Sequence, residues 1–344
     1  MRQADRLRAL LREGELDALL LTSDTCRLYA SGFPCSSGAA VLTREGDYLI
    51  TDFRYIEAAE QKAEGFTVRM CGKDNPLRKT AAAILSAHGC KRVGYEADTL
   101  SVREYELWLR EIPAVFVPAQ EAIAALRAVK TPAELAAIAA AQRVAESALD
   151  DVLLHFVRCG VSEKAVAGEL IAALYRAGAD GPAFAPIVAS GPNGALPHAE
   201  PSDRLIAKGD LLTLDFGALL CGYRSDMTRT YAMGAVSDGQ REVYALVLQA
   251  QQAGIAAVRA GVPGSEPDAR ARAVIESAGY GECFGHGFGH GVGLEVHETP
   301  NCNPTASEPL PAGAVITAEP GIYIKSRFGA RIEDMLAVTP GGCE

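Results

Sequence analysis

The feature of this sequence that most constrains its fold is an order of elements that occurs twice. Between residues 131 and 339, two predicted helices are followed by a predicted β-hairpin with two acidic residues, and this order then repeats. The first acids of the two hairpins, Asp215 and Glu319, are 104 residues apart (319 − 215). The second acids, Asp226 and Glu333, are 107 residues apart (333 − 226). Chance alternation in an α+β domain is the alternative, but so regular a period predicts two similar halves facing a shared cleft.

The predicted helices begin at capping signals. Thr131 is an N-cap residue, Pro132 takes the first helical position and Glu134 completes a capping box, so a long alanine-rich helix is expected to about Leu149. The other helices of the repeat are expected from about Ser162 to Gly178, from near Asp238 and from near Pro267. Their starts repeat with nearly the spacing of the acids, 107 residues (238 − 131) and 105 residues (267 − 162).

The capping signal at Thr131 also marks a predicted domain boundary, giving domains at residues 1–125 and 131–344. A chain of 344 residues is long enough for two domains. The first is expected to be a small α/β domain without a catalytic cluster. Its expected elements are a helix at Arg6–Arg12, a buried strand at Ala18–Thr22, a hairpin of Ala39–Thr43 and Asp47–Thr51, and a helix that a Ser101/Glu104 capping box opens and that ends near Glu111.

The first acidic hairpin is expected over residues 211–231. Strand alternation places Thr213 and Asp215 on one face, away from the apolar side chains. If the turn is centred between residues 220 and 221, Asp215 lies opposite Asp226, and Thr213 lies opposite Thr228. Opposed carboxylates, with Cβ atoms ~5 Å apart, repel each other and resist losing water. A cation between them would remove this conflict, whereas a register shifted by one residue would turn them apart.

The second acidic hairpin is expected over residues 314–339. Glu319 and Glu333 lie among apolar strand residues, so they are not simply solvated surface charges. Pro320 lacks a ladder donor and predicts a strand edge or a bulge beside Glu319. Arg331 lies two residues before Glu333 on the same face and is expected to orient a carboxylate.

Histidines gather in the segment between the two hairpins. The run 285–293 has a glycine at every second position and contains His286 and His290, and His297 follows closely. The four-residue spacing could place two ligands on one helix face, but each interior glycine would cost a helix ~1 kcal/mol. An extended segment whose backbone closely approaches a site is the better interpretation. His198, in a loop before the first hairpin, is a further candidate.

These side chains predict a particular class of metal site. Four carboxylates and one imidazole select hard or borderline divalent ions, and four negative charges match two such ions. Two ions ~3.5–4 Å apart can activate water and polarise a carbonyl, which is hydrolase chemistry. The nine cysteines are odd in number and widely spaced without a C-x-x-C pair, so we expect reduced thiols rather than a thiolate site.

Composition excludes several other classes of function. The net charge of −10 and the absence of a basic run argue against a nucleic-acid partner. The N-terminus is charged, and Asp17 interrupts its longest apolar run. We therefore expect neither a signal peptide nor a membrane span, and we place the protein in the cytoplasm.

Six motifs in a fixed order resemble one protein family. They are residues 188–198 (VASGPNGALPH), 214–218 (LDFGA), 225–230 (SDMTRT), 286–298 (HGFGHGVGLEVHE), 319–324 (EPGIYI) and 331–334 (RIED). Together they resemble the Xaa-Pro peptidases, aminopeptidase P and prolidase, of the pita-bread metallopeptidases. The resemblance covers essentially the whole chain. It implies an α+β protein with a C-terminal pita-bread (creatinase/aminopeptidase) fold and an N-terminal α/β creatinase-like domain.

The resemblance also implies a role for individual residues. The implied ligands of two divalent ions are Asp215, Asp226, His290, Glu319 and Glu333, of which Asp226 and Glu333 bridge the ions. Manganese is the expected metal, with cobalt, iron or zinc as alternatives. The other implied site residues are His286 beside the ligands, His198 and His297 in contact with the substrate and the tetrahedral intermediate, Glu319 as proton relay, and Tyr323 and Arg331 lining or supporting the site. A homodimer is expected.

The implied activity is metal-dependent hydrolysis of the bond between an N-terminal residue and proline. The substrate is then a peptide with proline at its second position, either a dipeptide or a longer peptide. Methionine aminopeptidases and creatinase are less similar, because the former usually lack a full N-terminal domain and the latter does not keep the ligand set. A non-catalytic pita-bread module that binds peptides or proteins is the alternative from another class.

Overall fold

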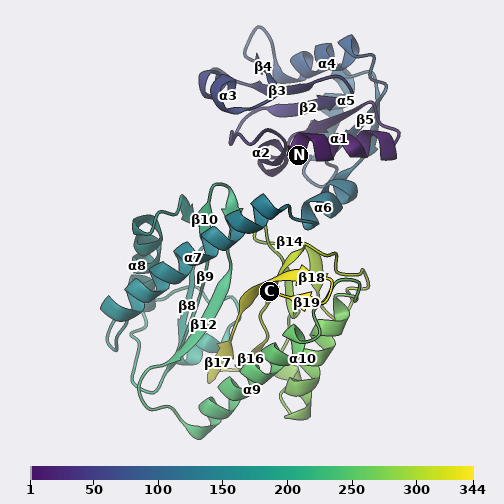
Figure 1. Ribbon diagram of the computed structural model, residues 1–344. Helices are drawn as coiled ribbons and strands as arrows, with labels where there is room; N and C mark the ends of the chain where they lie inside the picture. Colours follow the sequence, from purple (N-terminus) through teal and green to yellow (C-terminus); the bar gives the residue numbers. More distant parts are fainter. Residues whose placement is uncertain (1) are drawn as a thin grey trace. The chain divides into compact units, whose positions relative to one another are not determined.

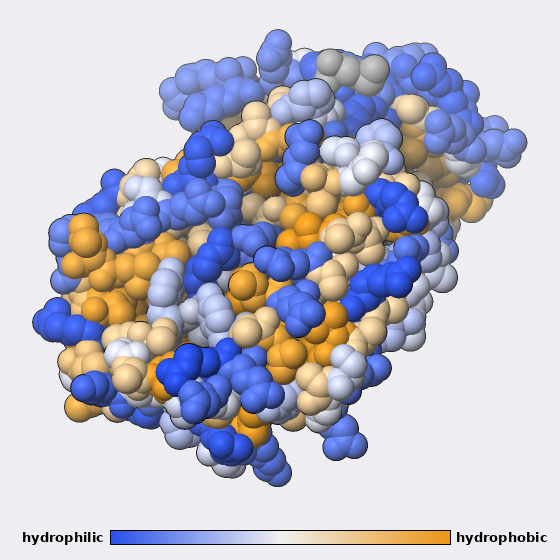
Figure 2. Space-filling model, turned by 60° about the horizontal axis from the view of Figure 1, so that its bottom comes forward, coloured by the Kyte–Doolittle hydropathy of each residue, from blue (hydrophilic) through white to orange (hydrophobic). Residues whose placement is uncertain are grey.

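The computed structural model describes residues 2–344, which divide into two compact units, unit 1 up to Arg127 and unit 2 from Ala128 to Glu344. Each unit contains both helices and strands (Figure 1). No helix in the described part of the chain is both long enough and apolar enough to span a membrane. On the face drawn in Figure 2, hydrophobic side chains occur in patches interrupted by hydrophilic ones.

Unit 1 is built on one six-stranded sheet with the strand order β4-β3-β2-β1-β5-β6. Its strands are β1 (Ala18–Leu21), β2 (Ala39–Thr43), β3 (Asp47–Thr51), β4 (Thr67–Met70), β5 (Arg92–Tyr95) and β6 (Val115–Pro118). Its helices are α1 (Gln3–Glu13), α2 (Asp24–Ser31), α3 (Ile56–Lys62), α4 (Leu77–Ala87), α5 (Val102–Glu111) and α6 (Gln120–Ala128). The predicted hairpin is confirmed, because β2 pairs antiparallel with β3.

One local prediction in unit 1 is only half right. The Ser101 hydroxyl accepts a hydrogen bond from the backbone N–H of Glu104 and so caps α5. Among the described hydrogen bonds, the reciprocal one from the Ser101 backbone to the Glu104 carboxylate is missing. Ser101 alone is therefore the cap, since the Glu104 side chain does not turn back along the helix.

Unit 2 contains the repeat. Its first half contains α7 (Pro132–His155), α8 (Glu163–Arg176), β7 (Gly181–Pro182), β8 (Ile187–Ser190), the 3₁₀ helix η1 (Gly191–Ala195), β9 (Leu211–Phe216), β10 (Ala218–Leu220), β11 (Tyr223–Arg224) and β12 (Met227–Ala232). Its second half contains α9 (Asp238–Ile255), α10 (Ser265–Ser277), the 3₁₀ helix η2 (Gly281–Cys283), β13 (Gly289–Gly291), β14 (Glu298–Cys302), β15 (Val315–Ala318), β16 (Gly321–Ile324), β17 (Phe328–Arg331), β18 (Asp334–Thr339) and β19 (Gly342–Cys343). The predicted order of two helices followed by strands is thus present twice.

Each half has its own apolar core, and the acidic strands lie where the halves meet. In the first half, α7 and α8 pack on β8 and β9, and in the second half α9 and α10 pack on β15 to β18 (Figure 1). The capping box of Thr131 is present, but α7 continues to His155, beyond the predicted end at Leu149. A bridge between Thr228 and Glu333 joins the two halves, with the Glu333 N–H 3.1 Å from the Thr228 carbonyl oxygen. The strands that carry the acids are therefore in direct contact.

The predicted register of the first acidic hairpin is wrong by two residues. Asp215 lies opposite Thr228 rather than Asp226, and Thr213 lies opposite Thr230. The turn is centred between Cys221 and Gly222, both of which have positive φ (51° and 85°), as a type I′ turn requires. Because a strand has period two, a slip of two residues keeps every side chain on its face.

In the second acidic hairpin the two acids do oppose each other. Ala318 pairs with Asp334 and Gly321 pairs with Arg331, so one register continues across a break in the strand pairing. Glu319 and Glu333 occupy opposite positions at this break. The strand ends at Ala318 and a new strand begins at Gly321, as Pro320 predicted.

Candidate metal centre

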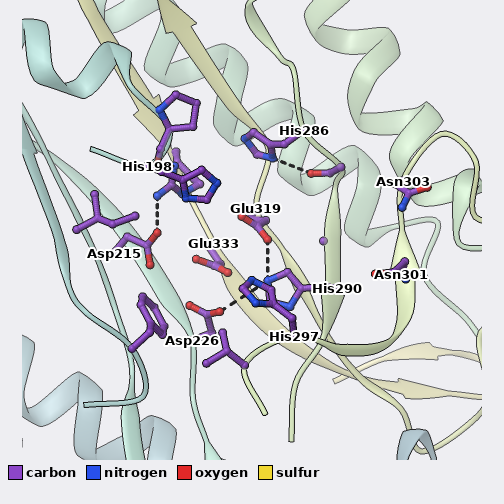
Figure 3. Close-up of a pocket in the computed structure, with 17 residues that line it drawn as sticks. His198, Asp215, Asp226, His286, His290, His297, Asn301, Asn303, Glu319 and Glu333 are labelled. Carbon is purple, nitrogen blue, oxygen red and sulfur yellow. Dashed lines mark hydrogen bonds and ion pairs between the residues drawn. The ribbon is translucent and has the colours of Figure 1, made fainter. Parts of the chain in front are cut away.

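Nine of the ten predicted site residues line one cavity of unit 2. The cavity has a volume of about 470 Å³. Its lining includes His198, Asp215, Asp226, His286, His290, His297, Glu319, Arg331 and Glu333 (Figure 3). Tyr323 is not part of this lining but contacts two of its members, as described below. The structure thus brings together acids and histidines from segments more than 100 residues apart.

The five predicted ligands come from strand ends and strand breaks. Asp215 lies near the end of β9, Asp226 directly before β12, and His290 in β13. Glu319 follows β15 and Glu333 precedes β18. Possible ligand atoms of Asp226, His290 and Glu333 all lie within 4.8 Å of one another. Asp215 is paired on both sides within its sheet, whereas Asp226, Glu319 and Glu333 lie just outside strands, and all four carboxylates face the cavity (Figure 3).

The imidazole of His290 is oriented by its own strand. Its Nδ1 is 3.1 Å from the carbonyl oxygen of Gly291, which can only accept, so Nδ1 carries the hydrogen. Nε2 faces the acids, 3.1 Å from Glu319 Oε1 and 3.8 Å from Asp226 Oδ2. Burial opposes the charged imidazole, but the hydrogen bond and charge of Glu319 outweigh burial and raise the pKa of His290. This arrangement, with Nδ1 on a carbonyl and Nε2 toward carboxylates, suits a metal ligand.

Asp215 supplies the observation that tests whether the site fits a metal. Its side chain is buried, and Oδ2 accepts a hydrogen bond from Arg331. Oδ1 is buried and has no hydrogen-bond partner among the described residues. A buried carboxylate oxygen without a donor is costly, because it has lost water and gained nothing in return. A cation in the cavity would satisfy it.

The pKa values of two other acids lead to the same conclusion. Burial, followed by repulsion from Asp215 and Glu319, raises the pKa of Asp226 well above its usual range. Burial, followed by repulsion from Asp226 and Glu319, raises the pKa of Glu333 in the same way. Opposite charge between these carboxylates would stabilise their ionised forms. The residues present therefore fit divalent cations held mainly by oxygen atoms.

Arg331 orients a carboxylate, as predicted, but that carboxylate is Asp215 rather than one in its own hairpin. One guanidinium nitrogen donates to Asp215, and Nε donates to Thr228 Oγ1 at 3.2 Å. The remaining nitrogen donates to Tyr323 Oη at 2.7 Å and to the Pro197 carbonyl oxygen at 3.2 Å. Arg331 therefore connects the two halves, because Asp215 belongs to the first half and Tyr323 to the second.

His286 is held as a neutral imidazole behind the acids. Its Nδ1 donates to the Gly287 carbonyl oxygen at 2.9 Å, and its Nε2 therefore accepts from Tyr323 Oη at 2.9 Å. Burial lowers the pKa of His286. Burial also raises the pKa of Tyr323 to about 12, so the hydroxyl stays protonated and can donate. Together with Arg331 these residues form one hydrogen-bonded chain beside the site.

His297 and His198 lie beside different ligands (Figure 3). The His297 ring packs edge to face on His290, with centroids 4.4 Å apart. Burial and the neighbouring His290 lower the pKa of His297. His198 follows Pro197, whose carbonyl oxygen is held by Arg331, and it lies near Asp215 in Figure 3. Two imidazoles are thus available to polar groups of a bound molecule.

The glycine-rich segment is extended, as predicted, but its glycines serve the strand packing. A Cβ on Gly289 would lie 2.0 Å from the Thr317 carbonyl oxygen, and one on Gly291 would lie 2.4 Å from that of Thr299. The closest approach is to neighbouring backbone, and Gly287 and Gly289 also line the cavity, so the segment does approach the site as predicted. It places His290 between β14 and β15.

Several further residues of the site were not predicted from the sequence. Thr228 donates to Glu333 Oε2 at 2.6 Å, and Thr317 donates to Glu319 Oε1 at 3.1 Å. Their signal was the spacing, because each threonine lies two residues from an acid in an acidic hairpin, where period two favours the same face. Asn301 and Asn303 also line the cavity, but nothing in their spacing separates them from surface residues.

The donor set and the two-unit fold define a metal-dependent enzyme, and comparison with known families specifies it. Residues 136–340 match the model described as metallopeptidase family M24, and residues 3–129 match the creatinase/prolidase N-terminal domain. The chain belongs to metallopeptidase family M24, with the pita-bread fold in its C-terminal unit.

Individual relatives are similar over almost their whole length. A curated relative, the uncharacterized peptidase YqhT of Bacillus subtilis, is 41% identical over 339 residues, which cover 98% of this chain and 95% of the relative. The solved structure of an Xaa-Pro dipeptidase from Bacillus anthracis has a TM-score of 0.94 and 39% identity, covering 99% of this chain and 96% of that chain. That of an X-Pro aminopeptidase from Thermotoga maritima has a TM-score of 0.94 and 34% identity, covering 100% and 97%.

Proposed function

We propose that this protein hydrolyses the peptide bond between an N-terminal residue and proline, using two divalent metal ions. The observation that carries the proposal is the group of four carboxylates and one imidazole that face one cavity, with a buried Asp215 oxygen lacking a donor. The names of the relatives, Xaa-Pro dipeptidase and X-Pro aminopeptidase, support this choice of substrate.

The metal ligands that we propose are Asp215, Asp226, His290, Glu319 and Glu333. Asp226 and Glu333 would gain most from bound cations, because burial and repulsion from neighbouring carboxylates raise the pKa of both well above the usual range. When bound, two such ions acidify water and polarise a carbonyl group. Thr228, Thr317 and Arg331 fix the directions of the carboxylates through the hydrogen bonds described above.

The remaining residues act on the substrate. Glu319 takes the proton of the attacking water and passes it to the proline nitrogen, so that the leaving amine departs protonated. His198 and His297 donate to the substrate and to the charge that develops on its carbonyl oxygen. His286, Tyr323 and Arg331 hold these groups in place. An Xaa-Pro bond carries no N–H, so peptidases that bind that donor fail on it, and a dedicated enzyme is required.

Three finer assignments belong to the same proposal. We propose manganese as the native ion, because four of five ligands are carboxylates. We propose the cytoplasm as the compartment, in keeping with nine free cysteines. We propose a homodimer on the basis of the family resemblance, and sedimentation of the purified protein tests it.

The proposed function is tested with purified protein that has been stripped of metal and reloaded with manganese. We expect hydrolysis of Ala-Pro, Ala-Pro-Ala or both, no hydrolysis of Ala-Ala-Ala at a comparable rate, and loss of activity with a chelator. A protein that binds these peptides with or without metal but cleaves none of them is instead a binding module, and the proposal is then wrong.

A further inference from the structure

Two buried carboxylates outside the cavity lie in the first turns of α8 and α10, the second helices of the two halves of unit 2. Glu163 is the first residue of α8 and is 0% exposed, and Asp268 lies in the first turn of α10 and is 1% exposed. Their positions in the repeat are not equivalent. The Glu163 N–H bonds the Arg204 carbonyl oxygen, and the matching N–H in the second half is that of Gly264, which bonds Glu308, so Asp268 lies one turn further into its helix. Neither carboxylate lines the cavity. Both accept several hydrogen bonds, and each holds a segment that carries a histidine of the site, Glu163 directly and Asp268 both directly and through Arg272.

Glu163 binds the loop that presents His198 at both of its ends. Oε1 accepts from the backbone N–H and the hydroxyl of Ser190, both at 2.7 Å. Oε2 accepts from Asn193 Nδ2 at 2.9 Å and from the backbone N–H and hydroxyl of Ser202, at 3.1 and 2.6 Å. His198 lies between Asn193 and Ser202, so one carboxylate closes the loop around it.

The same loop is held from the opposite side by the second half. Gly194 packs on Gly329 of β17, where a Cβ on Gly329 would lie 2.1 Å from the Gly194 carbonyl oxygen. Arg331 donates to the Pro197 carbonyl oxygen, directly before His198. The loop is thus held between Glu163 and β17, and the direction of His198 depends on both contacts.

Asp268 performs the corresponding task for the glycine-rich segment. Its Oδ1 accepts from the Phe288 backbone N–H at 3.0 Å, and both of its oxygens bind Arg272 at 2.9 Å. Arg272 in turn donates to the carbonyl oxygens of Phe284 and His286, at 2.9 and 2.8 Å. The Asp268–Arg272 ion pair therefore holds the backbone at residues 284, 286 and 288. The last of these lies two residues before His290.

We propose that Glu163 and Asp268 are positioning residues, Glu163 for the substrate-contacting His198 and Asp268 for the proposed metal ligand His290. The assignment of what each histidine does rests on the proposed function. The positioning itself rests on the hydrogen bonds above. Each carboxylate acts through a histidine, and neither touches the substrate or the metal.

The proposal predicts that the two variants fail in different ways. In Glu163→Gln, one carboxylate oxygen becomes an amide nitrogen, and whichever it replaces, a backbone N–H of Ser190 or Ser202 then faces another N–H group. We expect kcat/KM on Ala-Pro or Ala-Pro-Ala to fall about 10- to 100-fold, as for a misplaced catalytic group, with manganese affinity within about 2-fold of wild type. In Asp268→Asn we expect manganese affinity to fall about 10- to 100-fold, as for other residues that orient ligands.

A double-mutant cycle separates positioning from general loss of structure. If Glu163 acts through His198, Glu163→Gln lowers kcat/KM in the wild-type background but hardly changes it in His198→Ala. The matched control is Glu134→Gln, because Glu134 is also buried at the start of a helix and accepts from Thr131 and Tyr223, away from the cavity. We expect Glu134→Gln to retain kcat/KM and manganese affinity.

Several results would overturn the proposal. They are an undiminished effect of Glu163→Gln in the His198→Ala background, an equal loss of activity in Glu134→Gln, or unchanged manganese affinity in Asp268→Asn. If Glu163→Gln does not fold, Asn193→Ala removes one donor and should lower kcat/KM in the same direction. If wild-type protein cleaves neither peptide, the proposed function fails. The positioning roles can still be tested, by the manganese affinity of Asp268→Asn and by the position of loop 191–198 in a crystal structure of Glu163→Gln.

Discussion

At the scale of single residues, the site gathers buried carboxylates whose mutual repulsion a bound cation would relieve. Asp226 and Glu333 have raised pKa values because they are buried and repel neighbouring carboxylates. Asp215 has a buried oxygen without a donor among the described residues. Such groups lower the stability of the metal-free protein, and selection retains them only where they serve a function.

The first prediction concerns the cost of this charge. In metal-free protein at neutral pH, Asp226→Asn should raise Tm, because it removes a buried carboxylate whose ionised form is disfavoured. Each kcal/mol gained corresponds to roughly 2–4 °C. Differential scanning calorimetry measures the change, with Asp203→Asn, an exposed acid, as the control that should change Tm little. A lower Tm for Asp226→Asn in the absence of metal contradicts this account of the site.

The second prediction separates metal ligands from substrate contacts. His297 packs against the ring of His290 but lies 4.4 Å from it, centroid to centroid, rather than among the ligand oxygens. His297→Ala should therefore lower kcat about 10²–10³-fold, as for loss of a donor to developing charge, while both metal ions remain. Kinetics together with elemental analysis test it, and loss of metal would mean that His297 has been given the wrong role.

Site residues could be recognised in the sequence where they interrupt a regular pattern. Asp215 and Glu319 stood out because each interrupts an apolar strand, and His286 and His290 because of the glycines around them. Asn301 and Asn303 form part of the same cavity without such a signal. Their place depends on how β14 crosses beside β13, which no local pattern encodes.

At the scale of elements, helix starts could be predicted from the sequence, but the register of the first acidic hairpin could not. Helix starts at Thr131 and Ser162 were predictable because N-caps are local chemistry. The register of the first hairpin was not, because it depends on Cys221 adopting positive φ, which a non-glycine residue rarely does. The face assignment remained correct, since the error was two residues.

The third prediction concerns the glycine-rich strand. Gly289→Ala should destabilise the protein by about 1–3 kcal/mol or more and weaken metal binding, because the new methyl group meets the backbone of Thr317 beside His290. Gly285→Ala is the matched control, since a Cβ there meets nothing within 4 Å, and it should stay within about 0.5 kcal/mol. Urea denaturation measures the free energy of unfolding of both variants. Equal values would mean that the strands do not approach as closely as described.

At the scale of the whole molecule, the proposed ligands come from both halves of unit 2, so metal binding should stabilise the two halves together. The repeat of about 105 residues predicted this arrangement, because it implied two acidic hairpins at one cleft. What it could not predict is the cross-connection by Arg331 and Thr228, which depends on the halves packing directly on each other.

The fourth prediction follows for pH. A cation binds the ionised carboxylates, and the pKa values of Asp226 and Glu333 are raised, so binding releases protons and weakens as pH falls through those raised values. The stability of the metal-free protein should depend on pH in the opposite direction. Because the pKa values of these two acids are raised in the folded state, their contribution to stability is greatest when they are protonated and declines as pH rises. At a manganese concentration of about 100 Kd we expect a Tm increase of roughly 5–10 °C. That increase should shrink on acidification, and thermal scans across pH with and without manganese measure it.

The most direct measurement is an anomalous difference map, recorded at the manganese absorption edge, from crystals of the protein grown with that metal. We predict two peaks ~3.5–4 Å apart in the cavity, within bonding distance of Asp215, Asp226, His290, Glu319 and Glu333. No peak in the cavity, or peaks bound by other residues, would contradict the claim that these five side chains form a two-metal centre.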